Sequence, residues 1–387
     1  MISLVAVSAP VLLRMVQPAE VAASLADSLS GGRPIAPVPA DSIDGTRAIT
    51  MLQPTRPVTE ADAAAVIATS GSTGEPKGVV LSRAAIRASV EATRDQLDGV
   101  GDWALALPPY YVAGLMVLAR AYLGSTRAVP VRSDLDDLPE VARKLSARRY
   151  ISLVPPQLDR ALHRRSVAEA LAGFSAVLVG GGPSSDGLVG RAEAAGIKVV
   201  TTYGMSETCG GCVYDGQPLR GVALDIAENG RIMIRSSSLF SGYRLRPDLT
   251  REAVVDGWLR TQDRGRWEAG RLDVLGRIDD MVITGGFKVD LGEVERCVQR
   301  WAAQRAAHAA VLAVPDAVWG TVIVAVSDAA GSLGELQAAV RESLPGYAVP
   351  RELIFLDRLP WLAGGKLDRV AVRLMIRDAL AQRQATV

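Results

Sequence analysis

Short apolar runs alternate with amphipathic stretches over the first half of the chain, between Ala61 and Thr202. The apolar runs occupy residues 63–70, 103–108, 150–155, 175–182 and 197–204. Strands that are apolar throughout and separated by helices are typical of a parallel sheet covered by helices on both faces. This part of the chain is therefore predicted to be α/β, with helices after Ser82 and at 115–123 and 138–148 among those that cover the sheet.

The pattern changes after Gly210. Residues 221–237 and 265–277 consist of strand-like segments separated by turns, which predicts a smaller antiparallel β subdomain. From about Arg277 a new α+β unit is predicted, with a helix at 291–307, strands at 309–315 and 321–327, a helix from Leu333 and a proline-bounded tail from Leu344. We therefore expect two domains. Residues 1–277 would form a large N-terminal domain with parallel sheets and helices plus the antiparallel subdomain, and residues 278–387 a small α+β C-terminal domain.

The composition argues against several classes of protein. The 387 residues include 43 Lys and Arg against 42 Asp and Glu, a net charge of +1, so general nucleic-acid binding is not expected. Three cysteines are too few for the disulfide framework of a secreted protein, and a cytoplasmic location is expected. Cys209 and Cys212 form a C-x-x-C, but the chain has only two histidines, so neither a zinc site nor a redox pair is expected.

The N-terminal segment 1–16 is apolar but has no basic region and contains Arg14. It is therefore predicted to form a core strand and turn rather than a signal peptide. No run of about 18 apolar residues occurs elsewhere, so no membrane span is expected. The assembly state is left open, with a homodimer as one candidate.

Residues 69–78 read T-S-G-S-T-G-E-P-K-G and directly follow an apolar strand. Four hydroxyl side chains, three glycines and a lysine fit a loop whose backbone N–H groups and hydroxyls surround an anion such as phosphate. The stretch is not a Walker A loop, because Gly78 follows Lys77 where Ser or Thr is required. A flexible loop with no ligand is the alternative interpretation.

This loop resembles the signature loop of the adenylate-forming superfamily, which includes acyl-CoA synthetases, adenylation domains of peptide synthetases and luciferases. Further motifs of that superfamily follow in order: T-Y-G-M-S-E-T at 202–208, G-W-L-R-T-Q-D at 257–263, G-R-I-D-D at 276–280, G-G-F-K-V at 285–289 with E-V-E at 293–295, and G-G-K-L-D-R at 364–369. The resemblance thus extends from residue 69 to residue 369. It implies the superfamily's α/β architecture with a mobile C-terminal lid domain.

The resemblance also implies roles for particular residues. The predicted ATP-binding residues are Thr69, Ser70, Gly71, Ser72, Gly74, Gly181, Gly182, Tyr203, Gly204, Asp263 and Arg277. The predicted catalytic residues are Thr73, Lys77 and Lys366, and the predicted hinge is Asp279. Glu207 is predicted to hold Mg²⁺, which keeps few protein ligands and completes its shell with phosphate oxygens and water. Each of these residues, taken singly, also has a purely structural alternative. Glu207 could be a solvated loop acid, and Tyr203 a packed core residue. Asp263 could belong to a simple turn, and Arg277 could lie on the surface.

The reaction implied by the resemblance has two halves. A carboxylate attacks the α-phosphorus of ATP in line, which gives an acyl-adenylate and pyrophosphate, and the thiol of CoA then attacks the mixed anhydride. Lys366 stands on a glycine-rich loop far along the sequence from the phosphate loop. This fits a compact charge that the lid brings in to offset the negative charge growing between carboxylate oxygen and phosphorus. Rotation about Asp279 is then expected to bring the loop at 285–288 to face the acceptor thiol.

Two features bear on the acid. Residues 107–115 read L-P-P-Y-Y-V-A-G-L and match the superfamily's acyl-pocket motif, except that Tyr111 stands where many members have histidine. Arg120 follows among apolar neighbours, where a buried guanidinium needs a partner unless it extends to solvent. With the strand end at 178–183, this arginine resembles that of o-succinylbenzoate–CoA ligases of menaquinone biosynthesis, whose substrate has a second carboxylate to pair with it. The predicted acid-binding residues are Tyr111, Arg120 and Ser206.

Other functions remain to be weighed. The early position of the phosphate loop fits compact ligases of this type, but also other trimmed members, so another aryl- or acyl-CoA synthetase or a stand-alone adenylation enzyme stays open. A carrier-protein adenylation domain is less favoured, because no carrier segment follows residue 369. A non-catalytic nucleotide-binding relative would be expected to lack Glu207 or Lys366, and the sequence has both.

Overall fold

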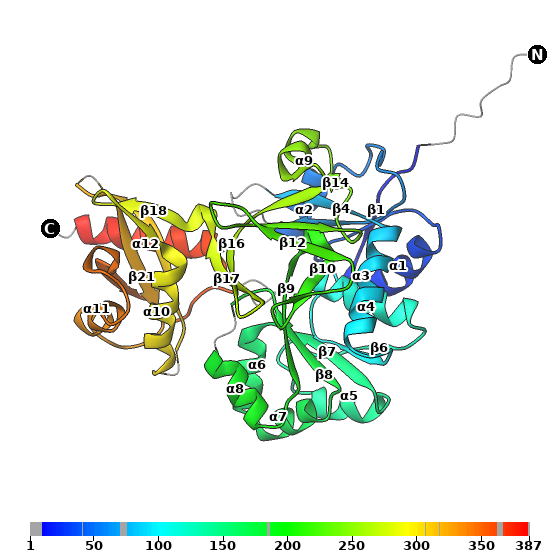
Figure 1. The fold of residues 1–387 in the computed structure, drawn as a ribbon, viewed down its shortest axis with the longest axis horizontal. Coiled ribbons are helices and arrows are strands. Elements are labelled where there is room, and N and C mark those ends of the chain that lie inside the picture. The colour runs from blue at the N-terminus through cyan, green and yellow to red at the C-terminus, as the bar shows by residue number, and fades with distance from the viewer. Residues whose placement is uncertain are drawn as a thin grey trace, which may run out of the picture. The chain divides into compact units, whose positions relative to one another are not determined.

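The computed structural model describes residues 10–40, 42–69, 76–183, 186–305, 307–316, 318–361 and 367–385. The chain folds into two compact units. Unit 1 comprises Met1–Leu224 and Ile234–Arg260, and unit 2 comprises Asp225–Met233 and Thr261–Val387. Figure 1 labels their helices and strands, which together make an α/β fold.

Unit 1 contains a seven-stranded sheet in the order β11–β10–β9–β8–β7–β5–β6. Its strands are β5 (Asp102–Leu105), β6 (Ala128–Pro130), β7 (Arg149–Leu153), β8 (Ala176–Gly180), β9 (Val199–Met205), β10 (Gly210–Tyr214) and β11 (Gln217–Pro218). The strands from β6 to β9 are parallel, and β10 and β11 extend one edge in antiparallel fashion. The prediction of parallel strands between residues 103 and 204 is therefore confirmed.

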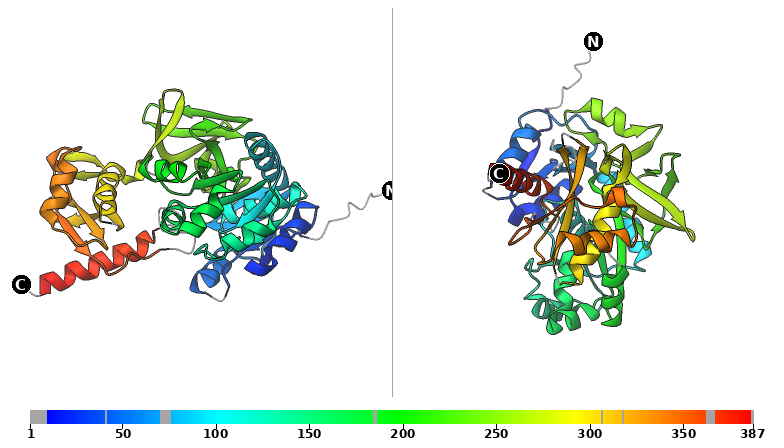
Figure 2. Two further views of the ribbon diagram at one scale, coloured as in Figure 1. Left: turned by 90° about the horizontal axis from the view of Figure 1, so that it is seen from below. Right: turned by 90° about the vertical axis from the view of Figure 1, so that its left-hand side faces the viewer.

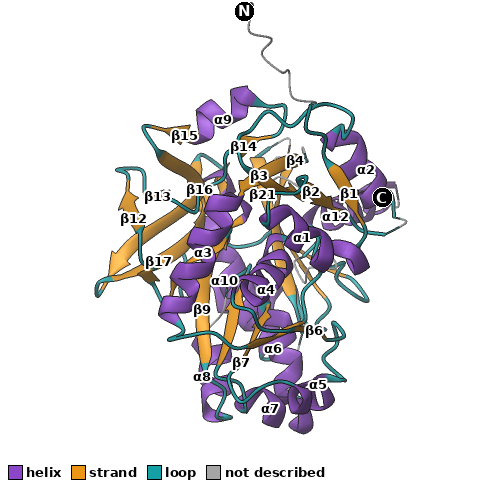
Figure 3. Ribbon diagram, turned by 90° about the vertical axis from the view of Figure 1, so that its right-hand side faces the viewer, coloured by secondary structure: helices purple, strands orange, loops and turns teal. Residues whose placement is uncertain are grey.

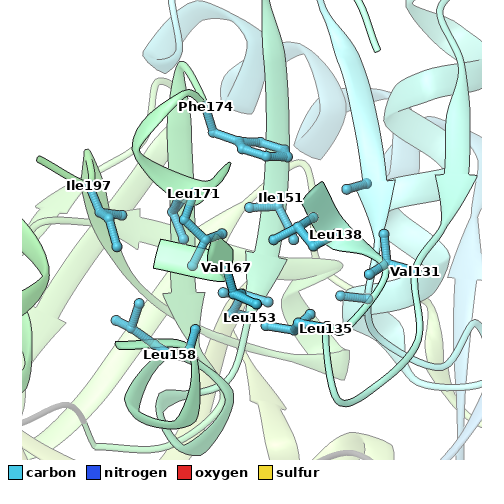
Figure 4. Close-up of a cluster of buried hydrophobic side chains, with 14 of the residues drawn as sticks. Val131, Leu135, Leu138, Ile151, Leu153, Leu158, Val167, Leu171, Phe174 and Ile197 are labelled. Atoms are coloured by element: carbon cyan, nitrogen blue, oxygen red, sulfur yellow. The ribbon is translucent and has the colours of Figure 1, made fainter. Parts of the chain in front are cut away.

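Both faces of this sheet are buried, and successive residues of a strand face opposite clusters. Ile151 and Val177 pack with α5 (Leu138–Lys144), α6 (Pro155–Leu162), α7 (Arg165–Ala172) and α8 (Asp186–Ala194), as Figure 4 shows for this cluster. Tyr150 and Leu178 pack in a second cluster with α3 (Arg83–Gln96) and α4 (Val112–Leu123). Figure 3 shows both groups of helices. Burial on both faces explains why these strands carry apolar residues on both faces rather than in strict alternation with polar ones.

A second sheet of unit 1 has the order β1–β2–β3–β4–β14. It contains β1 (Arg14–Val16), β2 (Ile35–Pro37), β3 (Ala63–Thr69), β4 (Lys77–Ser82) and β14 (Gly242–Tyr243). The expectation that residues 63–70 join the same parallel sheet as the later strands is wrong. The chain returns after β3 as its antiparallel neighbour β4, a pairing that does not require a crossover helix. Around this sheet the chain also forms η1 (Pro18–Glu20), α1 (Val21–Leu29), α2 (Ile43–Leu52) and α9 (Pro247–Ala253).

The segment 1–16 is described only in part. Residues 1–9 lie outside the described residues, and of the predicted core strand the structure has β1, which pairs with β2 in parallel. The antiparallel subdomain predicted after Gly210 is present as a sheet of five strands. These are β12 (Val222–Ile226), β13 (Arg231–Ser236), β15 (Val254–Val255), β16 (Trp258–Glu268) and β17 (Arg271–Arg277).

The later part of unit 2 has the predicted α+β composition (Figure 2, yellow to red). After η3 (Ile278–Asp280), the hairpin β18 (Met281–Thr284) and β19 (Phe287–Asp290) leads into α10 (Leu291–Ala303). The strands β20 (Ala309–Asp316), β21 (Gly320–Ser327) and β22 (Glu352–Phe355) form a sheet, with α11 (Leu333–Arg341) and η4 (Gly346–Ala348) between the last two. The final helix is α12 (Arg369–Ala385).

Several predicted boundaries need correction. The helix expected at 138–148 ends at Lys144, because Leu145 is extended and the N–H of Ser146 donates to Asp102. The helix expected at 291–307 ends at Ala303, and the one expected from residue 115 begins at Val112. The tail expected from Leu344 contains β22 and α12, whose buried stripe packs on the β20–β22 sheet. No helix in the described ranges combines the length and apolar character needed to cross a bilayer.

Candidate active site

Three predicted segments of unit 1 meet at the carboxyl edge of the seven-stranded sheet. Residues 181–182 follow β8 directly, and residues 203–204 lie near the end of β9. The two strands are parallel neighbours, with Gly180 opposite Thr202, so their ends lie side by side. Tyr111 follows β5 at the same edge as the N-cap residue of α4. Ligands of open α/β sheets bind in the crevice outside this edge.

Two glycines of these segments have conformations that a side chain would not permit. Gly181 has φ +80°, which favours glycine because it has no Cβ. A Cβ on Gly204 would lie 2.0 Å from the carbonyl oxygen of Gly210 on the neighbouring strand β10. Gly204 is therefore required by the close approach of two strands, independently of any contact with a nucleotide.

Glu207 lies on η2 (Ser206–Thr208), directly after β9. Thr208 is fully buried, and its hydroxyl fixes this turn: it accepts from the N–H of Met205 at 2.9 Å and is 2.6 Å from the carbonyl oxygen of Gly210. The N–H of Phe240 donates to the carbonyl oxygen of Glu207 at 2.8 Å. The backbone that carries Ser206 and Glu207 is therefore held from both sides.

The base of the predicted phosphate loop is a pair of strand ends. Thr69 ends β3, Lys77 begins β4, and the two are paired, with the Thr69 hydroxyl donating to the Lys77 carbonyl at 3.3 Å. The loop residues between them carry five of the predicted contacts. These five, Ser70, Gly71, Ser72, Thr73 and Gly74, lie outside the described residues.

Lys77 and Glu207 are joined through a residue that the sequence did not indicate. The Lys77 ammonium lies 5.1 Å from the ring centroid of Tyr243, and the hydroxyl of Tyr243 donates to Glu207 Oε1 at 2.8 Å. Burial, and then the charge of Glu207, raise the pKa of Tyr243 well above its usual range, so the phenol remains a proton donor. The ring of Tyr243 thus contacts the Lys77 cation, and its hydroxyl contacts the Glu207 carboxylate.

Tyr111 and Arg120 lie near opposite ends of α4. Tyr111 caps the first turn of α4, where its ring is 4.8 Å from that of Tyr110. Arg120 is nine residues further, about 13 Å along the helix axis at 1.5 Å per residue. Gly114 of the same motif packs closely against the preceding backbone, since a Cβ there would be 2.3 Å from the carbonyl oxygen of Pro108.

Arg120 is only 8% exposed, so the alternative that it extends to solvent is wrong. Its guanidinium carbon lies 5.2 Å from the ring centroid of Trp103 at the start of β5. It lines a cavity of about 250 Å³ together with residues of α3 and the loop before β5. Its Nε is buried and has no hydrogen-bond partner among the described residues. Such a group is costly unless an acceptor binds it.

The predicted sugar-binding residues lie in unit 2. Asp263 of β16 and Arg277 of β17 are opposite each other in the antiparallel pair, with Arg277 Nη1 3.5 Å from Asp263 Oδ1. Arg277 also donates to both carboxylate oxygens of Asp279, at 2.8 and 2.9 Å. The structure therefore brings both predicted ribose contacts and the predicted hinge residue into one cluster. Arg277 is engaged in ion pairs and is not the simple surface arginine of the alternative interpretation.

Lys366 lies outside the described residues, but both ends of its loop are described. Trp361 and Leu367 form an antiparallel bridge that closes the loop at its base. Arg369, at the start of α12, donates to Glu295 of α10 and to the carbonyl oxygen of Val311 on β20. Burial raises the pKa of Glu295, which the Arg369 cation opposes. The helix after the lysine loop is thus tied to the body of unit 2.

The donor set at Glu207 restricts which metal fits. Among the residues that the structure describes, no group of three or more His, Cys, Asp or Glu side chains is placed to hold a metal ion. A single carboxylate beside a phosphate-binding loop fits Mg²⁺, which is usually held by one or two carboxylates plus substrate phosphates. Cys209 and Cys212 are buried, and burial raises the pKa of both thiols, that of Cys212 to about 12. Such protonated thiols are poor nucleophiles and poor metal ligands.

Sequence reasoning missed two residues beside the phosphate loop. Tyr243 contacts Glu207 across 36 positions of sequence, through the pairing of β14 with β4. Its neighbour Arg244 is 3% exposed and donates to four carbonyl oxygens, one at the last residue of α2 and three in the segment that follows. Its own N–H donates to the carbonyl oxygen of Gly78 at 2.7 Å. Arg244 stands between Tyr243 and Leu245, and the sequence alone does not indicate which carbonyl oxygens it binds.

Two relatives are similar over most of the chain. A Mycobacterium tuberculosis (strain H37Rv) protein named "Probable 2-succinylbenzoate--CoA ligase" is 44% identical over 326 residues, covering 80% of this chain and 84% of its own. The "2-succinylbenzoate--CoA ligase" of Enterococcus faecalis is 30% identical over 350 residues, covering 83% of this chain and 71% of its own.

Solved structures agree with the sequence relatives. The o-succinylbenzoate coenzyme A synthetase from Bacillus subtilis, solved in complex with ATP and magnesium ion, has a TM-score of 0.69 and 28% identity, covering 80% of this chain and 69% of that one. The same synthetase with the acyl-adenylate intermediate has a TM-score of 0.72 and 25% identity, covering 92% and 81%. The family of AMP-binding enzymes matches residues 10–244, and the C-terminal domain of that family matches residues 293–366. The chain therefore belongs to the AMP-binding enzyme family, as its motifs predict.

Proposed function

We propose that this protein is an ATP-dependent acid–CoA ligase that activates o-succinylbenzoate as an acyl-adenylate and transfers the acyl group to CoA, a step of menaquinone biosynthesis. The observation that carries the proposal is the 44% identity with the mycobacterial ligase over 80% of the chain. The buried Arg120, with an unsatisfied Nε, independently supports an acid with a second carboxylate. The reduced, buried cysteines fit a reaction in the cytoplasm.

ATP would bind at the carboxyl edge of the seven-stranded sheet. The loop between Thr69 and Lys77 would surround the phosphates, with Lys77 as the cation at its end. Tyr203 offers a flat face for adenine. Gly181 and Gly182 have no side chains and would allow the backbone to approach the nucleotide. Asp263 would accept hydrogen bonds from the ribose hydroxyls, and Arg277 would donate to the same sugar.

Glu207 would hold Mg²⁺, which would neutralise charge on the phosphates and favour the departure of pyrophosphate. The single carboxylate and the neighbouring phosphate loop support this assignment, as does the relative solved with ATP and magnesium ion. The hydrogen bond from Tyr243 would keep the carboxylate in one orientation. Ser206, next to Glu207 on the same turn, would line the acid's side of the centre.

The first half-reaction needs no general base, because the substrate carboxylate is already ionised. One carboxylate oxygen attacks the α-phosphorus and the bond from that phosphorus to the β-phosphate oxygen breaks, which gives acyl-adenylate and pyrophosphate. Thr73, Lys77 and Lys366 would stabilise the charge on the transferring phosphate. In the second half the CoA sulfur attacks the acyl carbon, the bond to the adenylate oxygen breaks, and AMP leaves.

Arg120 would bind the carboxylate that does not react. It lies about 13 Å along α4 from Tyr111, in the cavity that Trp103 also lines. A carboxylate would complete the hydrogen bonding of the buried guanidinium. An acid without this second carboxylate would leave the cation unpaired, which supports selection of a dicarboxylate over benzoate.

The lid would consist of residues 278–387, with residues 1–277 as the nucleotide- and acid-binding domain. In this proposal Lys366 acts only in the first half-reaction. Rotation about Asp279 would then withdraw it and present the loop at 285–288 to CoA. The ion pair between Arg277 and Asp279 links the hinge to the predicted ribose contact, which gives ATP binding a route to influence the hinge.

Pyrophosphate release tests the function directly. The purified protein is assayed with ATP, Mg²⁺ and a panel of acids that includes o-succinylbenzoate, its monomethyl esters, benzoate, succinate and longer fatty acids. We expect release with o-succinylbenzoate, strongly reduced release with the ester that blocks the Arg120-binding carboxylate, and little with the others. Release with a different acid alone would instead support another acyl-CoA synthetase, and ATP binding without release would support a non-catalytic relative.

A further inference from the structure

Tyr243 lies on the two-residue strand β14, which is attached to the strand that begins with Lys77. β14 pairs with β4 in antiparallel fashion, with Tyr243 opposite Val79. The N–H of Tyr243 donates to Thr250 Oγ1 at 2.8 Å, and Arg244 anchors the next residue through its buried guanidinium. The side chain is only 8% exposed. Its position is thus fixed by contacts that do not involve the side chains of Lys77 or Glu207.

The side chain presents a different surface to each of its two charged neighbours. The ring lies beneath the Lys77 ammonium, 5.1 Å from ring centroid to Nζ. The hydroxyl donates to Glu207 Oε1 at 2.8 Å. Phe240 packs edge-on against the ring, with centroids 4.8 Å apart, and its N–H holds the backbone of Glu207. One tyrosine thus contacts both a cation at the start of β4 and a carboxylate on η2.

The two contacts have different chemical consequences. A cation over an aromatic face is attracted without being neutralised, so Lys77 keeps its charge for a phosphate. A phenol that donates to a carboxylate orients it without adding a charge, so Glu207 remains an anion for a metal ion. If Lys77 paired directly with Glu207, the ammonium would be less available to a phosphate and the carboxylate less available to a metal ion.

We propose that Tyr243 is a positioning residue for the metal–phosphate centre, holding Lys77 with its ring and Glu207 with its hydroxyl so that the two charges do not pair with each other. This inference rests on the proposed function, in which Glu207 holds Mg²⁺ and Lys77 contacts phosphate. It assigns a role to a side chain that need not touch the substrate. It also predicts that different substitutions of Tyr243 separate the effect of the hydroxyl from the effect of the ring.

The test measures binding rather than turnover. Calorimetric titration with α,β-methylene-ATP, which cannot release pyrophosphate, gives the nucleotide affinity with and without Mg²⁺. In Tyr243→Phe, which keeps the ring, we expect the gain in affinity that Mg²⁺ provides to fall about tenfold, the scale for one hydrogen bond to a charged group. The affinity without Mg²⁺ should stay within about twofold. In Tyr243→Leu, which loses the ring as well, the Mg²⁺-free affinity should also fall, about three- to fivefold.

Tyr214→Phe is the matched control. Tyr214 is also buried, and its hydroxyl is 3.1 Å from Thr93 Oγ1, away from Lys77 and Glu207. This variant should leave both affinities unchanged. An equal effect of Tyr214→Phe and Tyr243→Phe would show that loss of a buried hydroxyl merely perturbs unit 1, and would overturn the proposal.

Glu207→Gln changes the acceptor of the same hydrogen bond. It tests the proposed metal role of Glu207 separately from the proposed role of Tyr243. If Glu207→Gln loses the Mg²⁺-dependent gain and Tyr243→Phe keeps it, the role of Tyr243 is wrong while Glu207 remains the metal ligand. If Glu207→Gln keeps the full gain, the proposed metal role of Glu207 is wrong. A reduced gain in both variants, with no further loss when they are combined, is the result expected if Tyr243 acts through Glu207.

Discussion

At the scale of single residues, the informative side chains are buried charges that the described structure leaves incompletely satisfied. Arg120 is 8% exposed, stacks on Trp103 and has an Nε without a partner among the described residues. An apolar residue of similar volume would pack as well without the desolvation cost. In the proposed function, the second carboxylate of the acid would complete the hydrogen bonding of Arg120.

Arg120→Ala should raise the KM for o-succinylbenzoate and leave the affinity for ATP nearly unchanged. Loss of a buried, charge-assisted contact costs about 2–5 kcal/mol, which corresponds to an increase of at least about thirtyfold. Steady-state kinetics of pyrophosphate release measures both constants.

Arg149→Ala is the matched control for that experiment. Arg149 also has a buried Nε without a partner among the described residues, and its guanidinium lies 5.5 Å from the ring centroid of Phe174. Its removal should leave the KM for the acid unchanged. A wild-type KM in Arg120→Ala would mean that Arg120 is not a substrate contact, and equal increases in both variants would indicate a general effect on the fold.

At the scale of elements, a single carboxylate connects three segments of the seven-stranded sheet. Asp102, at the start of β5, accepts from the N–H and the guanidinium of Arg127 at 3.0 and 2.6 Å, and from the N–H of Ser146 at 2.8 Å. Burial opposes the charge, but these hydrogen bonds lower the pKa of Asp102 to about 2. The ionised carboxylate therefore stabilises the folded state.

Asp102→Asn should reduce the free energy of unfolding by about 2 kcal/mol at pH 7, the equivalent of this pKa depression. Because the folded pKa lies below the unfolded value of 3.8, the contribution is complete above about pH 4 and is lost as the pH falls toward 2. Urea unfolding followed by circular dichroism should thus show a difference from wild type that shrinks below pH 4. Asp134→Asn, at an exposed ion pair with Arg132, should change stability much less. A pH-independent difference for Asp102→Asn would contradict the electrostatic explanation.

The elements show what the sequence could and could not predict. Ile151 and Tyr150 lie on opposite faces and both are buried, so the apolar run of β7 was a reliable strand signal. The sheet to which β3 belongs depends on how the chain returns after residue 69, which local pattern does not specify. The helix α12 was missed because only two of its residues, Val372 and Ile376, are fully buried, and arginines are interspersed along it. The candidate site could likewise be predicted only where its residues form contiguous motifs, as Glu207 and Asp263 do. Tyr243 and Arg244 were not predicted, because their contacts are with residues distant in sequence.

At the scale of the whole molecule, the proposal assigns one lysine to one half of the reaction. Lys366→Ala should reduce adenylate formation by about 10²–10³, the scale for one donor that stabilises a transition state. Given synthetic acyl-adenylate and CoA, the variant should form thioester at close to the wild-type rate. Arginine should not restore the first half, because a planar guanidinium does not replace a compact ammonium. Stopped-flow assays of each half-reaction would show this division, and equal damage to both would contradict the alternation of the lid.

The central claim is that the acid is activated as an adenylate before it reaches CoA, and one isotope measurement tests it. o-Succinylbenzoate labelled with ¹⁸O in its carboxylates is incubated with the enzyme, ATP, Mg²⁺ and CoA, and the products are analysed by mass spectrometry. Attack of a carboxylate oxygen on the α-phosphorus predicts one ¹⁸O in AMP, none in pyrophosphate, and formation of o-succinylbenzoyl-CoA. Unlabelled AMP, or ¹⁸O in inorganic phosphate together with ADP, would contradict the account.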